Sequence, residues 1–271
     1  MKSFCVGSFY LGKIMKKLLI ALLLGSSLMA HAADKLVVGA SPTPHAELLE
    51  HLKPMLAKEG VELDIKVYTD YVQPNVQLVE KRIDANFFQH KPYMDEFNRS
   101  RGASLQSVAD VLIAPFGAYS KKITNMADLR DGAVVAIPND AVNGGRALQL
   151  LDQAKVIKLV DAKNNMATEK DIAQNPKNIK IKQLEAPMLP RVLGEVDLAI
   201  INTTFALEAK LSPSKDALAL ESGQSNYVNL LAARADNKDS PAMKKLVAAL
   251  QSPESKKFIL ERFKGNLVPA F

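Results

Sequence analysis

Beyond residue 33 the sequence alternates short strand-like runs with helix-like segments, and this alternation restricts the fold more than any other feature. The run Lys35–Ala40 ("KLVVGA") is apolar, and Val61–Tyr68 ("VELDIKVY") alternates apolar and polar residues with the period of a strand. Between them, apolar residues recur at helical spacing from Ala46 to Leu56, in a helix that Pro54 is expected to kink or shorten. Repeated strand–helix order predicts parallel sheets with helices on both faces.

The number of expected strands favours two lobes. Roughly ten strand-like segments occur, which is many for one sheet and ordinary for two. The chain has no internal repeat and no linker-like segment, so we expect it to cross between the lobes more than once, near residues 112–120 and 227–234. We predict a doubly wound α/β fold with a two-strand hinge, lobe I spanning residues 34–115 plus 231–271 and lobe II spanning residues 116–230.

The first 33 residues are typical of a secretory signal peptide and not of a folded domain. Two lysines precede the apolar run Leu18–Ala30, and an A-x-A pattern ends at Ala32, so cleavage is expected near Ala32. Met15 is an alternative start of this signal. An uncleaved membrane anchor is the other interpretation, which the shortness of the apolar run disfavours.

Net charge and cysteine content restrict which partners and which stabilising bonds we expect for this protein. The full chain carries +6, but four lysines and no acidic residue lie in residues 1–33, so the remainder carries +2 without a basic run. We therefore expect no nucleic-acid partner. The single cysteine, Cys5, precedes the expected cleavage site. The exported chain is thus expected to lack disulfides and a lipid-attachment cysteine, and to depend on its core for stability.

Polar and aromatic residues follow the expected strands directly, where ligands bind in open α/β sheets. The stretch "DANFFQHKPYMDEF" contains the candidates Phe88, His90 and Tyr93, whereas Phe87 is expected to face the core, because neighbouring strand residues point to opposite sides. Apolar walls with a few placed polar groups are typical of a small-molecule cleft. The candidates near other strand ends are Tyr71, Asn143, Arg146, Asn202 and Asn229.

Each candidate also has an ordinary structural interpretation. A lone histidine such as His90 is commonly a structural residue, and Tyr93 could cap the surface. Asparagines at strand ends, such as Asn202 and Asn229, commonly form turns. Arg146 opposes the dipole at the start of its helix and therefore needs an anion, which could be a ligand carboxylate or a nearby acidic side chain.

The sequence does not favour an enzyme. A periplasmic hydrolase or transferase would need a nucleophile with a base and an orienting partner. After cleavage near Ala32 the chain has no cysteine and three histidines, His45, His51 and His90, and no H-E-x-x-H, G-x-S-x-G or phosphate-loop pattern. His45 and His51 do not share a helical face, so we expect neither a metal site nor a cofactor. A surface adhesin would not require the polar residues at the strand ends.

Several segments, in one order, resemble the NlpA lipoprotein family, whose best-known members are the methionine-binding (MetQ-like) components of ABC importers. They are "DYVQPN", "DANFFQHKPYMDEF", "YSKKITNMADLRDGAVVAIPND", "NGGRALQLL", "LEAPMLPR", "AIINTTFA" and "YVNLLAAR". The resemblance runs from about Lys35 to the C-terminus. It implies a periplasmic-binding-protein fold, in which two α/β lobes close on an amino acid, and no catalytic residues.

The resemblance also implies roles for the candidate residues. A thioether favours aromatic edges, and a guanidinium can grip a carboxylate through two parallel hydrogen bonds. Four residues would line the slot for a methionine side chain: Tyr71, Phe88, His90 and Tyr93. Four others would hold the carboxylate and the ammonium: Asn143, Arg146, Asn202 and Asn229.

The implied partners are methionine, in its L or D form, and an ABC permease with its ATPase, as separate chains from a monomeric binding protein. A methionine-containing dipeptide or another apolar amino acid is the alternative ligand. The family is usually anchored by a lipid on a cysteine at the cleavage site, where this chain reads "MAHAAD". We therefore expect a freely diffusing periplasmic protein and not a lipoprotein.

Overall fold

The computed structural model describes residues 33–224 and 226–271, and Asp34–Phe271 form one compact unit. Residues 1–32 of the predicted signal peptide, Cys5 among them, lie outside the described residues. In the described part of the chain, no helix combines the length and the apolar character needed to cross a bilayer.

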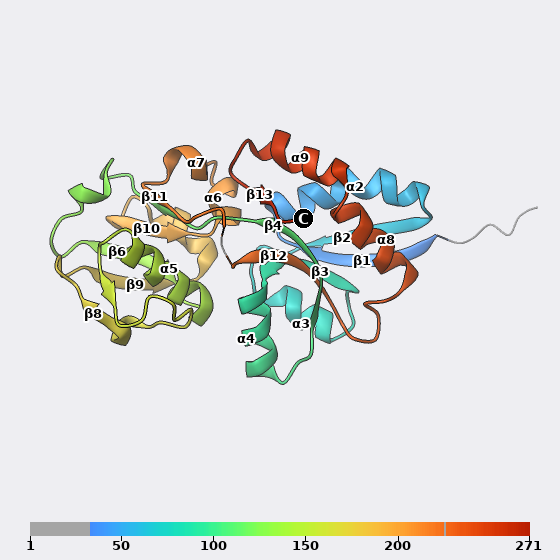
Figure 1. The fold of residues 1–271 in the computed structure, drawn as a ribbon, viewed down its shortest axis with the longest axis horizontal. Coiled ribbons are helices and arrows are strands. Elements are labelled where there is room, and N and C mark those ends of the chain that lie inside the picture. Colours follow the sequence, from blue (N-terminus) through green and yellow to red (C-terminus); the bar gives the residue numbers. More distant parts are fainter. Residues whose placement is uncertain (1–32, 225) are drawn as a thin grey trace, which may run out of the picture. The chain divides into compact units, whose positions relative to one another are not determined.

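The first sheet has six strands in the order β13-β4-β12-β3-β1-β2 (Figure 1). β1 pairs in parallel with β2 and β3, whereas β12 runs antiparallel to both β3 and β4. The bounds of these strands are β1 (Asp34–Ala40), β2 (Val61–Val67), β3 (Ala85–His90), β4 (Gln106–Ile113), β12 (Val228–Ala233) and β13 (Val268–Pro269).

Helices cover both faces of this sheet (Figure 1). The short helical segment η1 (Pro42–Ala46) leads into α2 (Glu47–Lys58), which packs with α8 (Pro241–Leu250) and α9 (Pro253–Phe263) on one face, and α3 (Gln73–Val79) and α4 (Lys91–Arg101) pack on the other. α2 continues past Pro54 to Lys58, so the expectation that Pro54 shortens it is wrong. Pro54 is exposed, and a missing backbone hydrogen bond on the solvent side of a helix is replaced by water.

Alternation along the strands divides the apolar residues of the first sheet between two cores. Val38 and Phe87 lie in the core beneath α2 and α8, whereas Val37 and Leu230 pack in a smaller core with α3 and α4. Phe87 is fully buried there, which confirms its prediction as a core residue. Because neighbouring strand residues point to opposite faces, Phe88 is turned away from this core.

The second sheet has five strands in the order β11-β5-β10-β6-β9. β6 pairs in parallel with β9 and β10, whereas β5 runs antiparallel to β10 and β11. The bounds are β5 (Gly117–Tyr119), β6 (Val134–Pro138), β9 (Lys180–Leu184), β10 (Leu198–Ile201) and β11 (Ala219–Leu220), and a separate pair is formed by β7 (Lys158–Leu159) and β8 (Ile172–Gln174).

The second sheet also has two apolar faces. Val135 and Ile200 pack in a core with α5 (Ala141–Gln153), whereas Ala136 and Ile201 pack with η4 (Ala186–Val192) and α6 (Thr203–Glu208). The remaining short helical elements are η2 (Met126–Asp128), η3 (Glu169–Asp171) and α7 (Pro213–Asp216).

Both sheets are mixed, so the expected parallel pairing holds for one part of each sheet and the other part is antiparallel. The chain passes from the first sheet to the second between β4 and β5 and returns between β11 and β12, without a helix at either passage. Parallel neighbours need a long crossover connection, whereas a strand that returns directly can join a sheet in the opposite direction. The predicted lobe limit at residue 230 falls within β12, which pairs in the first sheet, so a division after β11 fits the pairing better.

Candidate functional site

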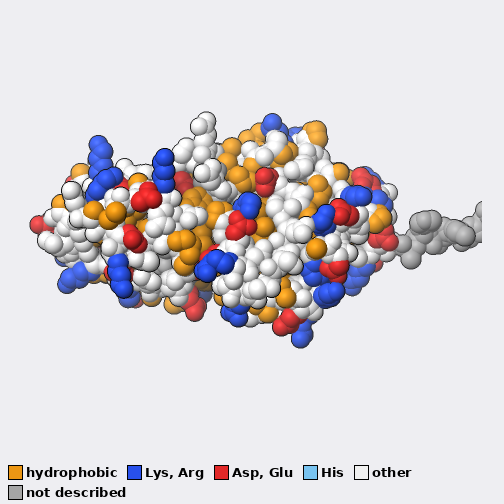
Figure 2. Space-filling view, turned by 60° about the horizontal axis from the view of Figure 1, so that its bottom comes forward, with side chains coloured by type: hydrophobic (Ala, Val, Ile, Leu, Met, Phe, Trp, Pro, Cys, Tyr) orange, Lys and Arg blue, Asp and Glu red, His pale blue; other side chains and the backbone are white. Residues whose placement is uncertain are grey.

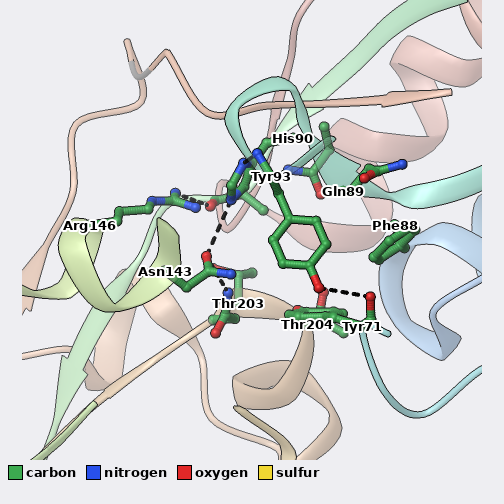
Figure 3. Close-up of a pocket in the computed structure, with 12 residues that line it drawn as sticks. Tyr71, Phe88, Gln89, His90, Tyr93, Asn143, Arg146, Thr203 and Thr204 are labelled. Atoms are coloured by element: carbon green, nitrogen blue, oxygen red, sulfur yellow. Dashed lines mark hydrogen bonds between the residues drawn. The ribbon is translucent and has the colours of Figure 1, made fainter. Parts of the chain in front are cut away.

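All eight candidate residues line one cavity between the two sheets, and six of them are labelled in Figure 3. Most of its lining comes from the ends of strands and the starts of the following helices, as the strand-end rule for α/β sheets predicts, whereas Asn229 lies at the start of the antiparallel strand β12. Tyr71, Phe88, His90, Tyr93 and Asn229 come from the first sheet and its helices, and Asn143, Arg146 and Asn202 from the second. Four further lining residues are Gln89, Ala114, Thr203 and Thr204.

Three aromatic rings form one wall of the cavity. The ring centroids of Phe88 and Tyr93 are 5.9 Å apart, and that of Tyr71 lies 5.7 Å from Phe88 and 6.2 Å from Tyr93. The Tyr93 hydroxyl donates to the backbone carbonyl of Tyr71 at 2.9 Å, which fixes one ring against the other. Burial raises the pKa of both tyrosines, so both stay neutral. The wall is therefore apolar in character and suited to an uncharged side chain.

His90 connects this wall to the polar end of the cavity. The Tyr93 backbone N–H donates to Nδ1 of His90 at 3.2 Å, so the ring proton must lie on Nε2, which faces Asn143 Oδ1 at 3.2 Å. Burial, helped by the charge of Arg146, lowers the pKa of His90 to about 3. His90 is therefore a neutral donor to Asn143, which links the two sheets.

The amide of Asn202 has an unpaired oxygen. Its Nδ2 donates to Asn143 Oδ1 at 3.2 Å, while Nδ2 of Asn143 donates to the carboxylate of Asp140. Asn202 is 7% exposed, and among the described residues its Oδ1 has no hydrogen-bond partner. A buried acceptor without a donor is unfavourable, so this oxygen is a natural partner for a donor group of a ligand.

Arg146 is held by an acidic side chain, which is the second of the two anions considered from the sequence. Its Nε donates to Glu221 Oε1 at 3.1 Å, and its Nη2 donates to Glu221 Oε2 and, at 3.0 Å, to the carbonyl of Ala114. Glu221 thus occupies the edge through which a guanidinium forms two parallel bonds. This edge is therefore not available for the expected two-bond grip on a ligand carboxylate, and Nη1 is the nitrogen left to face a ligand.

Asn229 is oriented by a histidine that the sequence analysis did not choose as a site residue. His45 is fully buried, lies edge-on to the Phe87 ring, and its Nε2 is 2.8 Å from Asn229 Oδ1. Burial lowers the pKa of His45 to about 4, so the ring is neutral and donates through Nε2. The amide oxygen of Asn229 is thereby engaged, and Nδ2 of Asn229 donates to the Tyr227 carbonyl at 3.4 Å, so one N–H of its NH₂ group is left for the cavity.

Of the further residues at the site, some could have been identified from the sequence by the strand-end rule and one could not. Thr203 and Thr204 directly follow Asn202, and Gln89 lies between two candidates, so the strand-end rule that found their neighbours also points to them. His45 ends the polar segment after β1 and was visible in the same way. Glu221 lies 75 residues from Arg146, and no spacing pattern connects the two.

The described residues show no metal-binding cluster, and the face in Figure 2 shows no strongly basic surface. No cluster of three or more His, Cys, Asp or Glu side chains that could hold a metal ion occurs among them. On the face shown in Figure 2, acidic and basic side chains are interspersed, without the basic stripe typical of nucleic-acid-binding proteins. The cavity therefore offers hydrogen bonds, one guanidinium and an aromatic wall.

Comparison with known proteins gives a consistent picture. Residues 36–271 match the family described as NlpA lipoprotein. The chain is 44% identical over 239 residues to the probable D-methionine-binding lipoprotein MetQ of Pasteurella multocida, covering 88% of this chain and 86% of that protein.

Two solved structures are similar in fold and sequence. The nutrient-binding protein of Burkholderia cenocepacia bound to methionine is 47% identical, with a TM-score of 0.84, covering 87% of this chain and 100% of that one. The ABC transporter periplasmic substrate-binding protein of Coxiella burnetii is 42% identical, with a TM-score of 0.83 and the same coverage. These similarities confirm the predicted two-lobed α/β binding-protein fold, and the chain belongs to the NlpA lipoprotein family.

Proposed function

We propose that the protein captures methionine between its two lobes and delivers it to an ABC importer. The Pasteurella relative is named for D-methionine binding, the Burkholderia structure is described as bound to methionine, and the Coxiella structure is described as a substrate-binding protein of an ABC transporter. The relatives are named for binding and not for catalysis. The permease and the ATPase would be separate chains that receive a monomeric, ligand-loaded protein.

The observation that carries this proposal is the division of one cavity into an apolar wall and a polar end with an unpaired acceptor. The thioether would pack against Tyr71, Phe88 and Tyr93, where each sulfur–aromatic contact contributes about 0.3–1.5 kcal/mol. The ammonium would donate to Oδ1 of Asn202.

The carboxylate would then lie at the remaining donors of the polar end. These are Nη1 of Arg146 and one N–H of Asn229, since Glu221 engages the other nitrogens of Arg146, and His45 and the Tyr227 carbonyl engage the rest of the Asn229 amide. Such an arrangement would suit a zwitterionic amino acid with an apolar side chain. Because the lining comes from both lobes, ligand binding favours the closed form by its difference in affinity between the closed and the open forms.

Calorimetry on the refolded protein tests the ligand. The protein is first unfolded and dialysed, so that retained cargo is removed and can be identified by mass spectrometry. L-methionine, D-methionine, a methionine-containing dipeptide and leucine are then titrated. We expect a methionine enantiomer to bind most tightly. Arg146→Ala should weaken that binding about 10- to 100-fold, through loss of a charge-assisted bond. Tighter binding of leucine or the dipeptide, or no binding at all, would refute the proposal.

We also propose that the protein is exported to the periplasm, cut near Ala32 and released without a lipid. The A-x-A pattern that ends at Ala32 supports this proposal, although relatives in the family are named lipoproteins. Mass spectrometry of the N-terminal peptide from the periplasmic fraction checks it. A peptide that starts at or next to Ala33 is expected, and a lipid-modified cysteine would contradict the proposal.

A further inference from the structure

Glu221 directly follows β11 and does not line the cavity, yet its side chain is only 12% exposed. Its backbone N–H donates to the carbonyl of Phe116 at 2.9 Å, and the Phe116 N–H donates back to Glu221 Oε2 at 3.2 Å. The carboxylate is therefore fixed by the backbone that leads into β5, independently of any ligand.

The fixed carboxylate of Glu221 holds the guanidinium of Arg146 in a single orientation. Glu221 accepts from both Nε and Nη2, and the faces of the guanidinium are covered by the rings of Phe116 and Tyr227, whose centroids lie 4.6 Å and 4.2 Å from Cζ. In the described part of the structure, Nη1 has no protein partner. A ligand carboxylate therefore meets a guanidinium that is already oriented.

Glu221 also changes the charge that a ligand meets. Among the described residues that line the cavity, Arg146 is the one that carries a formal charge, since His90 is neutral. Glu221 offsets this charge, and the carboxylate of Asp140, bonded to Asn143, adds negative potential at the same end. A carboxylate ligand without a positive group would thus bring an uncompensated negative charge into a buried site.

We propose that Glu221 is a positioning residue that orients Arg146 and offsets its charge, so that the cavity selects zwitterionic amino acids over simple carboxylate anions. The inference rests on the proposed binding of methionine. Glu221, a residue outside the cavity, would then allow the protein to discriminate between methionine and 4-(methylthio)butanoate, an analogue that lacks only the amino group.

Two variants separate the two roles of Glu221. Glu221→Gln keeps the shape of the side chain and one of the two oxygens that accept from Arg146, but removes the charge and replaces the second oxygen with an NH₂ group. Glu221→Ala removes both the charge and the acceptor. Glu254→Gln is the matched control. Glu254 is a half-exposed carboxylate on α9 that bonds His51 of α2, and it does not line the cavity.

Calorimetry with L-methionine and with 4-(methylthio)butanoate measures the preference, as the ratio of the two Kd values, and thermal unfolding checks that each variant is folded. The unaltered protein should prefer methionine by about 100-fold or more. Glu221→Gln should lower this preference about 10-fold, chiefly by strengthening binding of the anion. Glu221→Ala should also lower this preference, and its Kd for methionine should be higher than that of Glu221→Gln. Glu254→Gln should leave both Kd values unchanged.

The outcomes distinguish this inference from the proposed function. If the unaltered protein binds methionine and Glu221→Gln keeps the full preference, or weakens both ligands by one common factor, Glu221 does not select for charge and the inference is wrong. If the unaltered protein binds no methionine, the proposed function fails and the inference fails with it.

Discussion

At the scale of single residues, the polar end of the cavity is built from amides whose orientation is set by neighbours. The Asn202 amide donates to Asn143 and keeps an unpaired oxygen, and a buried group of this kind costs about 1–3 kcal/mol. That cost is removed when a ligand donates to the oxygen. The unpaired oxygen destabilises the ligand-free protein, and the removal of this cost contributes to the free energy of ligand binding.

Asn202→Ala tests this view. The variant should weaken methionine binding about 10- to 100-fold, because a hydrogen bond to a charged ammonium contributes about 1.5–3 kcal/mol. Its ligand-free unfolding free energy should change little, since the unpaired oxygen disappears together with the bond to Asn143. Calorimetry and urea unfolding measure the two quantities. Asn266→Ala should show the reverse pattern, because Asn266 bonds Ser212 and Ser214 and does not line the cavity.

The buried histidines should make stability depend on pH. Burial lowers the pKa of His45 to about 4 and that of His90 to about 3, whereas an unfolded histidine titrates near 6.5. Below pH 6.5 the unfolded chain binds protons that the folded chain does not bind. The stability contributed by each neutral ring is therefore complete above pH 6.5 and is lost as the pH falls toward 4.

Urea unfolding at pH 7, 6 and 5 measures this loss. Each histidine should remove about 2 kcal/mol from the unfolding free energy between pH 7 and pH 5. His45→Gln retains a donor for Asn229 but does not titrate, so its loss over this range should be about 2 kcal/mol smaller than that of the unaltered protein. Equal losses in both proteins would contradict the assignment of His45 as a neutral buried group.

Individual side chains show how far the sequence predicts a site. Phe88 and Asn202 were predictable because Phe88 lies near the end of β3 and Asn202 directly follows β10, and the carboxyl ends of parallel strands meet at one edge of a sheet. The partner of Arg146 was not predictable. The need for an anion follows from the helix dipole, but the choice between a ligand and Glu221 depends on which backbone segments the tertiary fold brings together.

At the scale of elements, α5 carries two of the residues that line the cavity, Asn143 and Arg146, and is fixed at its start. Asp140 caps the helix by accepting from the Asn143 N–H at 2.9 Å. One turn later, Gly145 lies against the backbone of the loop near Asn165, where an added Cβ would be 2.8 Å from the Asn165 carbonyl carbon. The close approach of this loop therefore requires glycine and sets the position of the adjacent Arg146.

Gly145→Ala should destabilise the protein by about 1–3 kcal/mol, because the backbone it meets cannot move as a flexible side chain can. Methionine affinity should fall as well, since the shift displaces Arg146. Gly194→Ala is the matched control, because an added Cβ there meets nothing within 4 Å. Urea unfolding and calorimetry compare the two variants. Equal stability in both would show that α5 can move away from the loop at little cost.

The elements themselves were predictable where one periodicity dominates. β2 (Val61–Val67) follows the predicted alternating run closely. Near residues 112–120, where a crossing between the lobes was expected, the chain leaves β4 of the first sheet and enters β5 of the second. Periodicity describes the exposure of one strand and does not reveal which sheet it joins. That choice depends on contacts distant in sequence.

At the scale of the whole molecule, residues beyond the cavity hold the two halves together around it. The ring of Phe205, on α6, lies 4.9 Å from the ring of Tyr71, which belongs to the half built on the first sheet. Phe205 does not line the cavity. Because the lining is almost entirely buried, a ligand can leave only when such contacts between the halves separate.

Phe205→Leu should therefore speed the release of methionine more than it slows its capture, as most interface changes act on dissociation. A several-fold faster release is expected, with a stability loss of about 1 kcal/mol. Stopped-flow tyrosine fluorescence measures the rates. Phe258→Leu is the control, since Phe258 stacks on His51 away from the cavity. Identical release rates in Phe205→Leu and the unaltered protein would show that this contact does not restrain opening.

The position of β12 has a consequence for how the chain can be made. β12 lies between β3 and β4 in the first sheet, yet it follows every strand of the second sheet in the sequence. A nascent chain that has emerged only as far as β11 can complete its later-made sheet, but β3 and β4 still expose unsatisfied edges. Such edges attract other chains. The earlier-made half must therefore be shielded until the last segment arrives to close it.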